Sequence, residues 1–139
     1  MSAKLAIMKP LAHPTVELLV DGSRSNGTYA VLDIRLPRGL AIPRHVRRGI
    51  TGVVQLLDGA LELRTDDEPA VIVRRGVVRL PERRPIAVRV LEAARLVAVL
   101  VPAGAAKLLP AVADPLVLPD DRAALLAAAG ITTLPSLSC

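Results

Sequence analysis

The sequence predicts an all-β barrel or sandwich followed by one short helix. Between residues 16 and 101, short apolar stretches, many of them alternating with polar residues, are separated by turn-forming residues at intervals of about 8–12. After residue 104 this pattern ends, and a segment with helix start and stop signals follows. The apolar fraction of 52% is enough for a core, so the 139 residues are expected to form one domain rather than a disordered chain.

The predicted strands follow one another along the first three quarters of the chain. In one of them, apolar Ala30, Leu32 and Ile34 alternate with polar residues, which is the period of a half-buried strand. Pairs such as Asn26-Gly27 and Asp58-Gly59 favour tight turns because these residue types tolerate positive φ. A turn is also expected near residues 91–94. The clearest of roughly nine short strands are residues 16–20, 29–36, 50–57, 60–64, 71–73, 77–80, 86–90 and 96–101.

Helix signals are concentrated near the C-terminus. Asp120 can cap a helix over residues 121–129, Asp121 suits the positive end of its dipole, and Gly130 suits a left-handed stop. Residues 103–118 are rich in Ala, Leu and Pro without a clear period, so we expect an irregular connector there. The helix is expected to dock on the barrel through Leu125, Leu126 and Ile131.

Composition argues against several classes of protein. Apolar runs such as residues 96–101 are far shorter than the about 20 residues of a membrane span. The N-terminal residues lack the apolar length of a secretory signal, so we expect a cytoplasmic protein without membrane contact. The net charge of +5 is spread along the chain and Tyr29 is the only aromatic residue, which argues against a nucleic-acid partner. Cys139 is the only cysteine, which excludes an internal disulfide.

Residues 39–59 carry a spaced motif. Gly39 is followed by five residues and His45, one residue and Arg47, four residues and Gly52, then six residues and Gly59. This spacing resembles the first motif of the cupin superfamily, in which two histidines and a glutamate stand between two glycines. His45 matches the first histidine, whereas Arg47 and Gly52 replace the second histidine and the glutamate.

A second stretch resembles the other cupin motif less closely. That motif runs Gly, five residues, Pro, one residue, Gly, two residues, His. Pro81 fits the proline, Arg75 and Arg83 take the glycine positions, and Ile86 takes the position of the final histidine. Both motifs and the gap between them fit one register.

The resemblance is to small single-domain bacterial cupins and implies a cupin-type double-stranded β-helix, or jelly-roll, barrel. It covers residues 15–104, and it extends loosely over residues 105–139. We therefore expect an N-terminal arm over residues 1–14, a barrel over 15–104, and a connector with a C-terminal helix packed on the barrel over 105–139.

The departures from the motif argue against a metal centre. A typical cupin site uses three histidines and one carboxylate, ligands that suit iron, manganese, nickel or zinc. Of these four positions only His45 keeps a donor, because Arg47 is a permanent cation and Gly52 and Ile86 offer none. We expect no bound metal and no other cofactor.

Strand parity predicts what lines the barrel instead. Side chains alternate across a strand, so if His45 and Arg47 point inward, Pro43 should too. Asp33 is expected to face solvent, and Tyr29 could add a hydroxyl at one end of the lumen. The expected ligand-binding residues are His45, Arg47, Val54, Leu56, Ile86, Val88 and Tyr29.

Three functions remain open from the sequence. The first is a metal-free small-molecule-binding domain, in which His45 and Arg47 hold an anionic or carbonyl group and aliphatic walls cover an apolar body. The second is a metal-independent isomerase, lyase or cyclase, for example of a biosynthetic pathway, with His45 as general acid or base and Arg47 stabilising an oxyanion. The third is a structural or dimerising subunit with a filled barrel.

A homodimer is also expected. Small cupins often pair through edge strands or swapped N-terminal strands, and an exposed apolar patch would otherwise favour aggregation. The first 20 residues offer an apolar set for such a contact, namely Leu5, Ile7, Met8, Leu11, Val16, Leu18 and Leu19.

Overall fold

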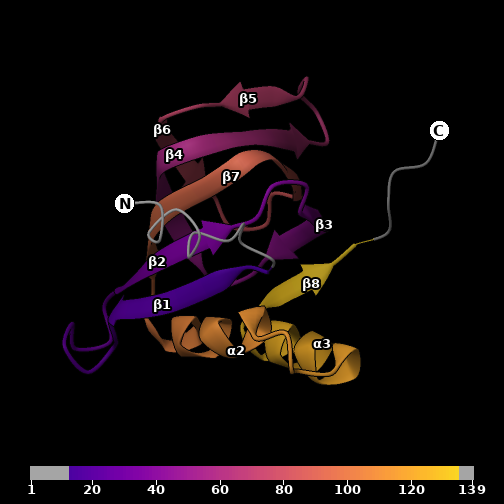
Figure 1. Ribbon diagram of the computed structural model, residues 1–139. Helices are drawn as coiled ribbons and strands as arrows, with labels where there is room; N and C mark the ends of the chain where they lie inside the picture. Colours follow the sequence, from indigo (N-terminus) through magenta and orange to yellow (C-terminus); the bar gives the residue numbers. More distant parts are fainter. Residues whose placement is uncertain (1–12, 135–139) are drawn as a thin grey trace, which may run out of the picture.

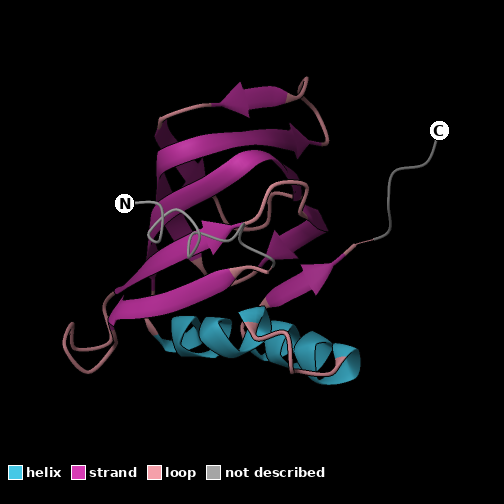
Figure 2. Ribbon diagram, in the orientation of Figure 1, coloured by secondary structure: helices cyan, strands magenta, loops and turns pink. Residues whose placement is uncertain are grey.

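The computed structural model describes residues 13–134, which form antiparallel strands with short helical segments at one end (Figure 1). The strands are β1 (Thr15–Val20), β2 (Ala30–Leu36), β3 (Ala41–Arg47), β4 (Thr51–Thr65), β5 (Val71–Val73), β6 (Gly76–Leu80), β7 (Ile86–Val101) and β8 (Ile131–Thr133). The helical segments are η1 (Gly104–Leu108), α2 (Leu109–Ala113) and α3 (Pro119–Ala128). Figure 2 shows these helices grouped on one side of the strands, so the predicted all-β class with a helical tail is confirmed.

Two long strands, β4 and β7, belong to both walls of the barrel. The first part of β4 pairs with the end of β7, and this pair continues to β6 on one side and to β2 and β1 on the other. The rest of β4 pairs with the start of β7 and continues to β5 on one side and to β3 and β8 on the other. The walls thus have the strand orders β1-β2-β7-β4-β6 and β8-β3-β7-β4-β5, the expected jelly-roll arrangement.

The bend between the two walls lies where the β4–β7 register shifts, between Leu56 and Leu61. Gly59 sits there at φ +90°, and a Cβ on it would lie 2.2 Å from the backbone oxygen of Ala93. The prediction that Asp58-Gly59 and residues 91–94 are turns between separate strands is therefore wrong. The Asp-Gly pair forms a bulge, which bends a strand and leaves its pairing intact on both sides.

Alternation along the strands sets the inner and outer faces of the walls. On β2, Leu32 is fully buried, whereas Asp33 points to the outer side and pairs with Arg95 at 3.1 Å. On β4, Val53 and Leu57 are 42% and 41% exposed, as expected for the outer face. The inner faces form two apolar clusters, one around Leu32 and Leu100 and the other around Leu56 and Val90.

Two strands have no counterpart in the predicted set. The β3 strand was recognised only through its motif, because Pro43 and two arginines obscure its alternation. Its register shifts between Ile42 and His45, so parity fails across the bulge and Pro43 is exposed instead of facing inward. The β8 strand pairs with β3, and Ile131 docks on the barrel as part of that strand.

The helical tail differs from its prediction in two details. Asp120 is not the N-cap: Leu118 holds that position without a side-chain cap, Pro119 begins the helix, and Asp120 lies in the first turn. Gly130 ends the helix at φ +81°, as predicted, and a Cβ there would lie 2.5 Å from the backbone oxygen of Arg48. The connector is helical, with η1 and α2 lying over β1 and β2.

The N-terminal region is described only from His13. Val16 and Leu18 pack against the core, whereas Leu19 is 44% exposed. Leu5, Ile7, Met8 and Leu11 lie outside the described residues, and the homodimer stays a prediction. Among residues 13–134, each helix is too short or too polar to cross a membrane.

The bend of β4 gives a test of the fold. Gly39→Ala, outside the bend, is the control. It is expected to lower the free energy of unfolding by about 1–2 kcal/mol, because φ is +87° at this position but nothing lies within 4 Å of the new Cβ. Gly59→Ala should lose about 3 kcal/mol or more, because it adds a backbone clash to the same strain. Urea denaturation measures both, and equal losses would contradict the close approach of β4 to β7.

Candidate functional site

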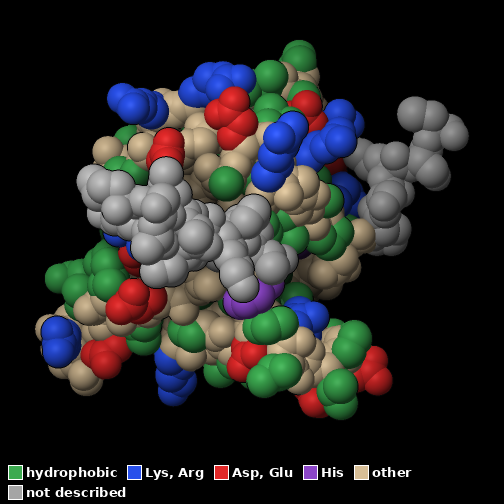
Figure 3. Space-filling view, viewed as in Figure 1, with side chains coloured by type: hydrophobic (Ala, Val, Ile, Leu, Met, Phe, Trp, Pro, Cys, Tyr) green, Lys and Arg blue, Asp and Glu red, His purple; other side chains and the backbone are tan. Residues whose placement is uncertain are grey.

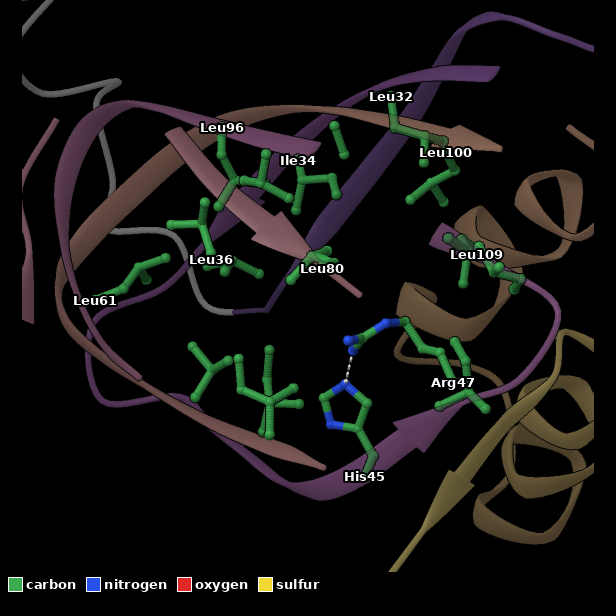
Figure 4. Close-up of a pocket in the computed structure, with 18 of the residues that line it drawn as sticks. Leu32, Ile34, Leu36, His45, Arg47, Leu61, Leu80, Leu96, Leu100 and Leu109 are labelled. Atoms are coloured by element: carbon green, nitrogen blue, oxygen red, sulfur yellow. Dashed lines mark hydrogen bonds between the residues drawn. The ribbon is translucent and has the colours of Figure 1, made fainter. Parts of the chain in front are cut away.

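A partly open cavity between the two walls is the candidate site. The cavity has a volume of about 250 Å³, slightly below the about 300–1,000 Å³ of typical ligand pockets. Apart from His45 and Arg47, every residue that lines it is Leu, Ile, Val or Ala. Figure 4 shows the two polar side chains reaching from β3 into this aliphatic space. One wall of the cavity therefore carries all of its polar side-chain atoms.

The Arg47 guanidinium is buried inside the barrel. Arg47 is the last residue of β3 and is 5% exposed. Its Nη1 donates to His45 Nε2 at 3.1 Å, and its Nη2 donates to the backbone oxygen of Pro81 at 3.1 Å. Burial lowers the pKa of the Arg47 guanidinium, but arginine keeps its proton in proteins. A permanent positive charge therefore sits against hydrocarbon.

His45 is held as a neutral ring with one defined tautomer. Its Nδ1–H donates to the backbone oxygen of Pro43 at 2.9 Å, so Nε2 carries the lone pair that accepts from Arg47. Burial is the main cause that lowers the pKa of His45, and the positive charge of Arg47 lowers it further. At neutral pH the ring thus accepts one hydrogen bond from Arg47 and adds no charge.

The charge of Arg47 has no acidic partner in residues 13–134. None of the ion pairs there includes it, and its Nε is buried without a hydrogen-bond partner. Residues 1–12 and 135–139 contain no Asp or Glu. Other arginines are paired nearer the surface, as in Arg44–Asp66 and Arg95–Asp33, and Figure 3 shows basic and acidic side chains side by side.

The loop between β6 and β7 fixes the position of Arg47. Besides the Pro81 contact, the backbone N–H of Arg83 donates to the backbone oxygen of Arg47 at 2.7 Å. The Glu82 carboxylate accepts from the Gly49 N–H at 2.9 Å, which joins the same loop to the residues after β3. Contacts between the β6–β7 loop and the end of β3 therefore fix the position of the Arg47 backbone and of its guanidinium.

The structure brings together most of the expected site residues. His45, Arg47, Val54, Ile86 and Val88 line the cavity. Leu56 faces inward but is 2% exposed and packs in the core, outside the cavity lining. Tyr29 is 40% exposed and does not line the cavity, because it precedes inward-facing Ala30 and so takes the opposite side.

Other lining residues were missed by motif-based analysis. The alternation of Leu61 and Leu63 with Glu62 and Arg64 would have indicated that Leu63 faces inward. Val78 and Leu80 lie opposite Val54 and Gly52, so they share the inner face with positions of the motif. Leu109 lines the cavity from α2, which packs on β1, whereas Ala129 and Ile131 reach it where the chain returns to β3 after α3.

The four positions of the cupin metal motif do not form a metal site. His45 and Ile86 are paired across β3 and β7, so the two motifs meet in space. However, the lone pair of His45 is engaged by Arg47, and a metal there would face a fixed cation. At Gly52 a Cβ would lie 2.7 Å from Leu100 Cδ2. Among residues 13–134, no three His, Cys, Asp or Glu side chains are grouped to hold a metal.

No protein-family model matches the chain, and no curated protein matches its sequence. The Cnp3 cupin domain of Schizosaccharomyces pombe is similar in structure with a TM-score of 0.57 and 16% identity, over 70% of this chain and 71% of that one. The chain has the cupin fold. A double-stranded β-helix protein from Klebsiella pneumoniae resembles this chain with a TM-score of 0.56 and 12% identity, over 75% and 90% of the two chains.

A cupin-fold enzyme is also among the similar structures. The DMSP lyase DddQ from Ruegeria pomeroyi has a TM-score of 0.54 and 20% identity, over 66% of this chain. This chain spans about half of DddQ, 48% of its length. At such identities the fold alone is shared, and the lyase activity belongs to DddQ.

The neutral state of His45 gives a pH dependence. Below about pH 6.5, His45 is protonated in the unfolded chain. In the folded protein the buried ring stays neutral, so acid favours the unfolded state. The free energy of unfolding is therefore not reduced by His45 above that pH. Below it, the free energy of unfolding declines by at most about 1.4 kcal/mol per pH unit because of this histidine. Urea denaturation between pH 5 and 8 should show a smaller decline in His45→Gln than in the wild type. His13→Gln, at an exposed ring, is the control and should keep the wild-type slope; equal slopes for all three proteins would contradict the buried neutral ring.

Proposed function

We propose that this cupin is a metal-free small-molecule-binding domain whose barrel takes an organic anion with an apolar body. The observation that carries the proposal is the buried, acid-free guanidinium of Arg47, with its Nε unpartnered inside an aliphatic cavity. An isolated charge in apolar surroundings is costly unless it is paired and hydrogen-bonded. A ligand anion would supply the missing negative charge and the missing acceptor together.

The walls support the same type of ligand. Small-molecule sites combine an apolar surface with a few polar groups that fix the orientation of the ligand. Here Arg47 supplies the charged hydrogen bonds, His45 holds one terminal nitrogen of the guanidinium, and side chains such as Val54 and Val88 cover the apolar part. Charge-assisted bonds to arginine are also stronger than neutral ones.

The other two functions fit the geometry less well. As a general base, His45 would use Nε2, which already accepts a hydrogen bond from Arg47, so that bond would have to break first. A metal-independent isomerase, lyase or cyclase thus needs a rearranged site. A filled barrel with a purely structural role is disfavoured by the cavity of about 250 Å³.

Thermal unfolding in the presence of organic anions tests the proposal. A ligand at ten times its Kd should stabilise the protein by about 1.4 kcal/mol, which raises the melting temperature by roughly 5 °C. A panel of small carboxylates, phosphates, sulfonates, ketones and amines is compared at equal concentration. At least one anion should stabilise the wild type, and Arg47→Met should abolish that shift.

The matched control is Arg48→Met, which removes a cation from the next residue on the exposed side of the chain. This variant should keep the ligand-induced shift of the wild type. Arg47→Lys should retain only a weak shift, because a lysine offers a point charge without the planar pair of donors. If no anion stabilises the wild type, or if Arg47→Met responds like Arg48→Met, the proposed function is wrong.

A further inference from the structure

We infer that the ligand is a short aliphatic monocarboxylate, bound with its carboxylate on Arg47 and its hydrocarbon chain inside the barrel. This inference rests on the binding function proposed above and specifies its ligand class. Three features carry it: the number of free donors, the position of Arg47 between two pockets, and the volume of the cavity.

The donors fit one carboxylate. A guanidinium has five N–H groups, and within residues 13–134 only two of those on Arg47 are used, one by His45 and one by Pro81. Three N–H groups remain, one on Nε and one on each terminal nitrogen, and a carboxylate accepts two parallel bonds from such a guanidinium. The Nε atom is buried, so a pair of bonds that includes it requires the neighbouring side chains to move aside. The Nδ1–H of His45 is already committed to Pro43, so Arg47 alone supplies donors.

The walls argue against a second polar group on the ligand. All other residues lining the cavity are Leu, Ile, Val or Ala, which offer no side-chain hydrogen bonds. A second carboxylate, a phosphate dianion or a hydroxylated chain would therefore place unsatisfied polar atoms against hydrocarbon. The ligand that matches these walls has one charged end and an otherwise apolar body.

A second pocket shows how the carboxylate end is oriented. This outer pocket, of about 330 Å³, shares Arg47, Leu63, Val78 and Ile86 with the cavity, and beside other apolar residues it carries Glu68, Arg79 and Arg84. Arg47 therefore lies at the boundary between a pocket of mixed character and an aliphatic one. A carboxylate on Arg47 can lie on the side of the outer pocket, while its chain extends into the aliphatic cavity drawn in Figure 4.

The cavity volume sets the chain length. At roughly 30 Å³ per non-hydrogen atom, the share of a water molecule in the liquid, 250 Å³ holds about eight such atoms. Hexanoate has this size. We therefore expect the best ligands to be saturated acids of about six to eight carbons.

Calorimetric titration with a chain-length series tests the ligand class. Affinity for the wild type should rise from acetate to a maximum at hexanoate to octanoate and then fall, with acetate and dodecanoate at least tenfold weaker than the maximum. Adipate, hexyl phosphate, hexanol and hexylamine should also bind at least tenfold more weakly than hexanoate. A series without a maximum, or adipate binding as well as hexanoate, would overturn the inference.

Cavity-filling variants test where the chain lies. In Figure 4, Leu61 and Leu109 lie at opposite ends of the cavity. Leu61→Phe or Leu109→Phe should move the preferred ligand to a shorter acid, whereas Leu57→Phe, on the outer face of the same strand as Leu61, should not. If the Phe variants do not fold, Leu61→Val and Leu109→Val enlarge the two ends, and one of them should favour a longer acid. No shift in any folded variant would overturn the placement of the chain.

The two proposals fail in different ways. If hexanoate does not bind but another anion of the panel stabilises the wild type in an Arg47-dependent manner, the monocarboxylate class is wrong and the binding function stands. If no anion of any class stabilises the wild type, both are wrong.

Discussion

The pairing of β4 with β7 is the constraint on which the rest of the molecule depends. It runs from Thr51 opposite Val101 to Thr65 opposite Ile86, and every other strand except β1 and β8 pairs directly with one of these two. Because the pair bends at Gly59, one ladder belongs to two facing walls. The interior between them exists only because this bend holds the walls apart, and the β3 side chains enter that interior.

Sequence patterns predicted the walls better than the connections between them. Alternation identified the inner faces of β2 and β4, because a period of two depends only on neighbouring residues. The bulges near Asp58 and after Ile42 were not predictable, since a bulge and a turn share the same local signals and differ only in what lies across the strand. β8 was missed for a similar reason: three residues carry no period, and only pairing with β3 makes them a strand.

The candidate site was predictable in its composition but not in its electrostatics. Motif spacing indicated that His45, Arg47 and Ile86 would converge, and the pairing of His45 with Ile86 agrees with that register. The missing counter-charge of Arg47 depends on where every carboxylate of the chain lies. Glu82 directly follows Pro81, which accepts from Arg47, yet its carboxylate turns to the Gly49 N–H instead. No local pattern contains that information.

The replacement of a histidine by Arg47 in a cupin frame changes which charge the interior attracts. A histidine at that position offers a lone pair, and several such lone pairs attract a metal cation. An arginine at the same inward position offers only N–H donors and a permanent positive charge. It also donates a hydrogen bond to the remaining lone pair, on His45 Nε2, which is then not available to a metal. Under the proposed function, the preferred partner of the interior changes from a cation to an anion while the fold is kept. A buried cation without an acid is costly to stability, and such costs are typical of residues that are retained for binding rather than for folding.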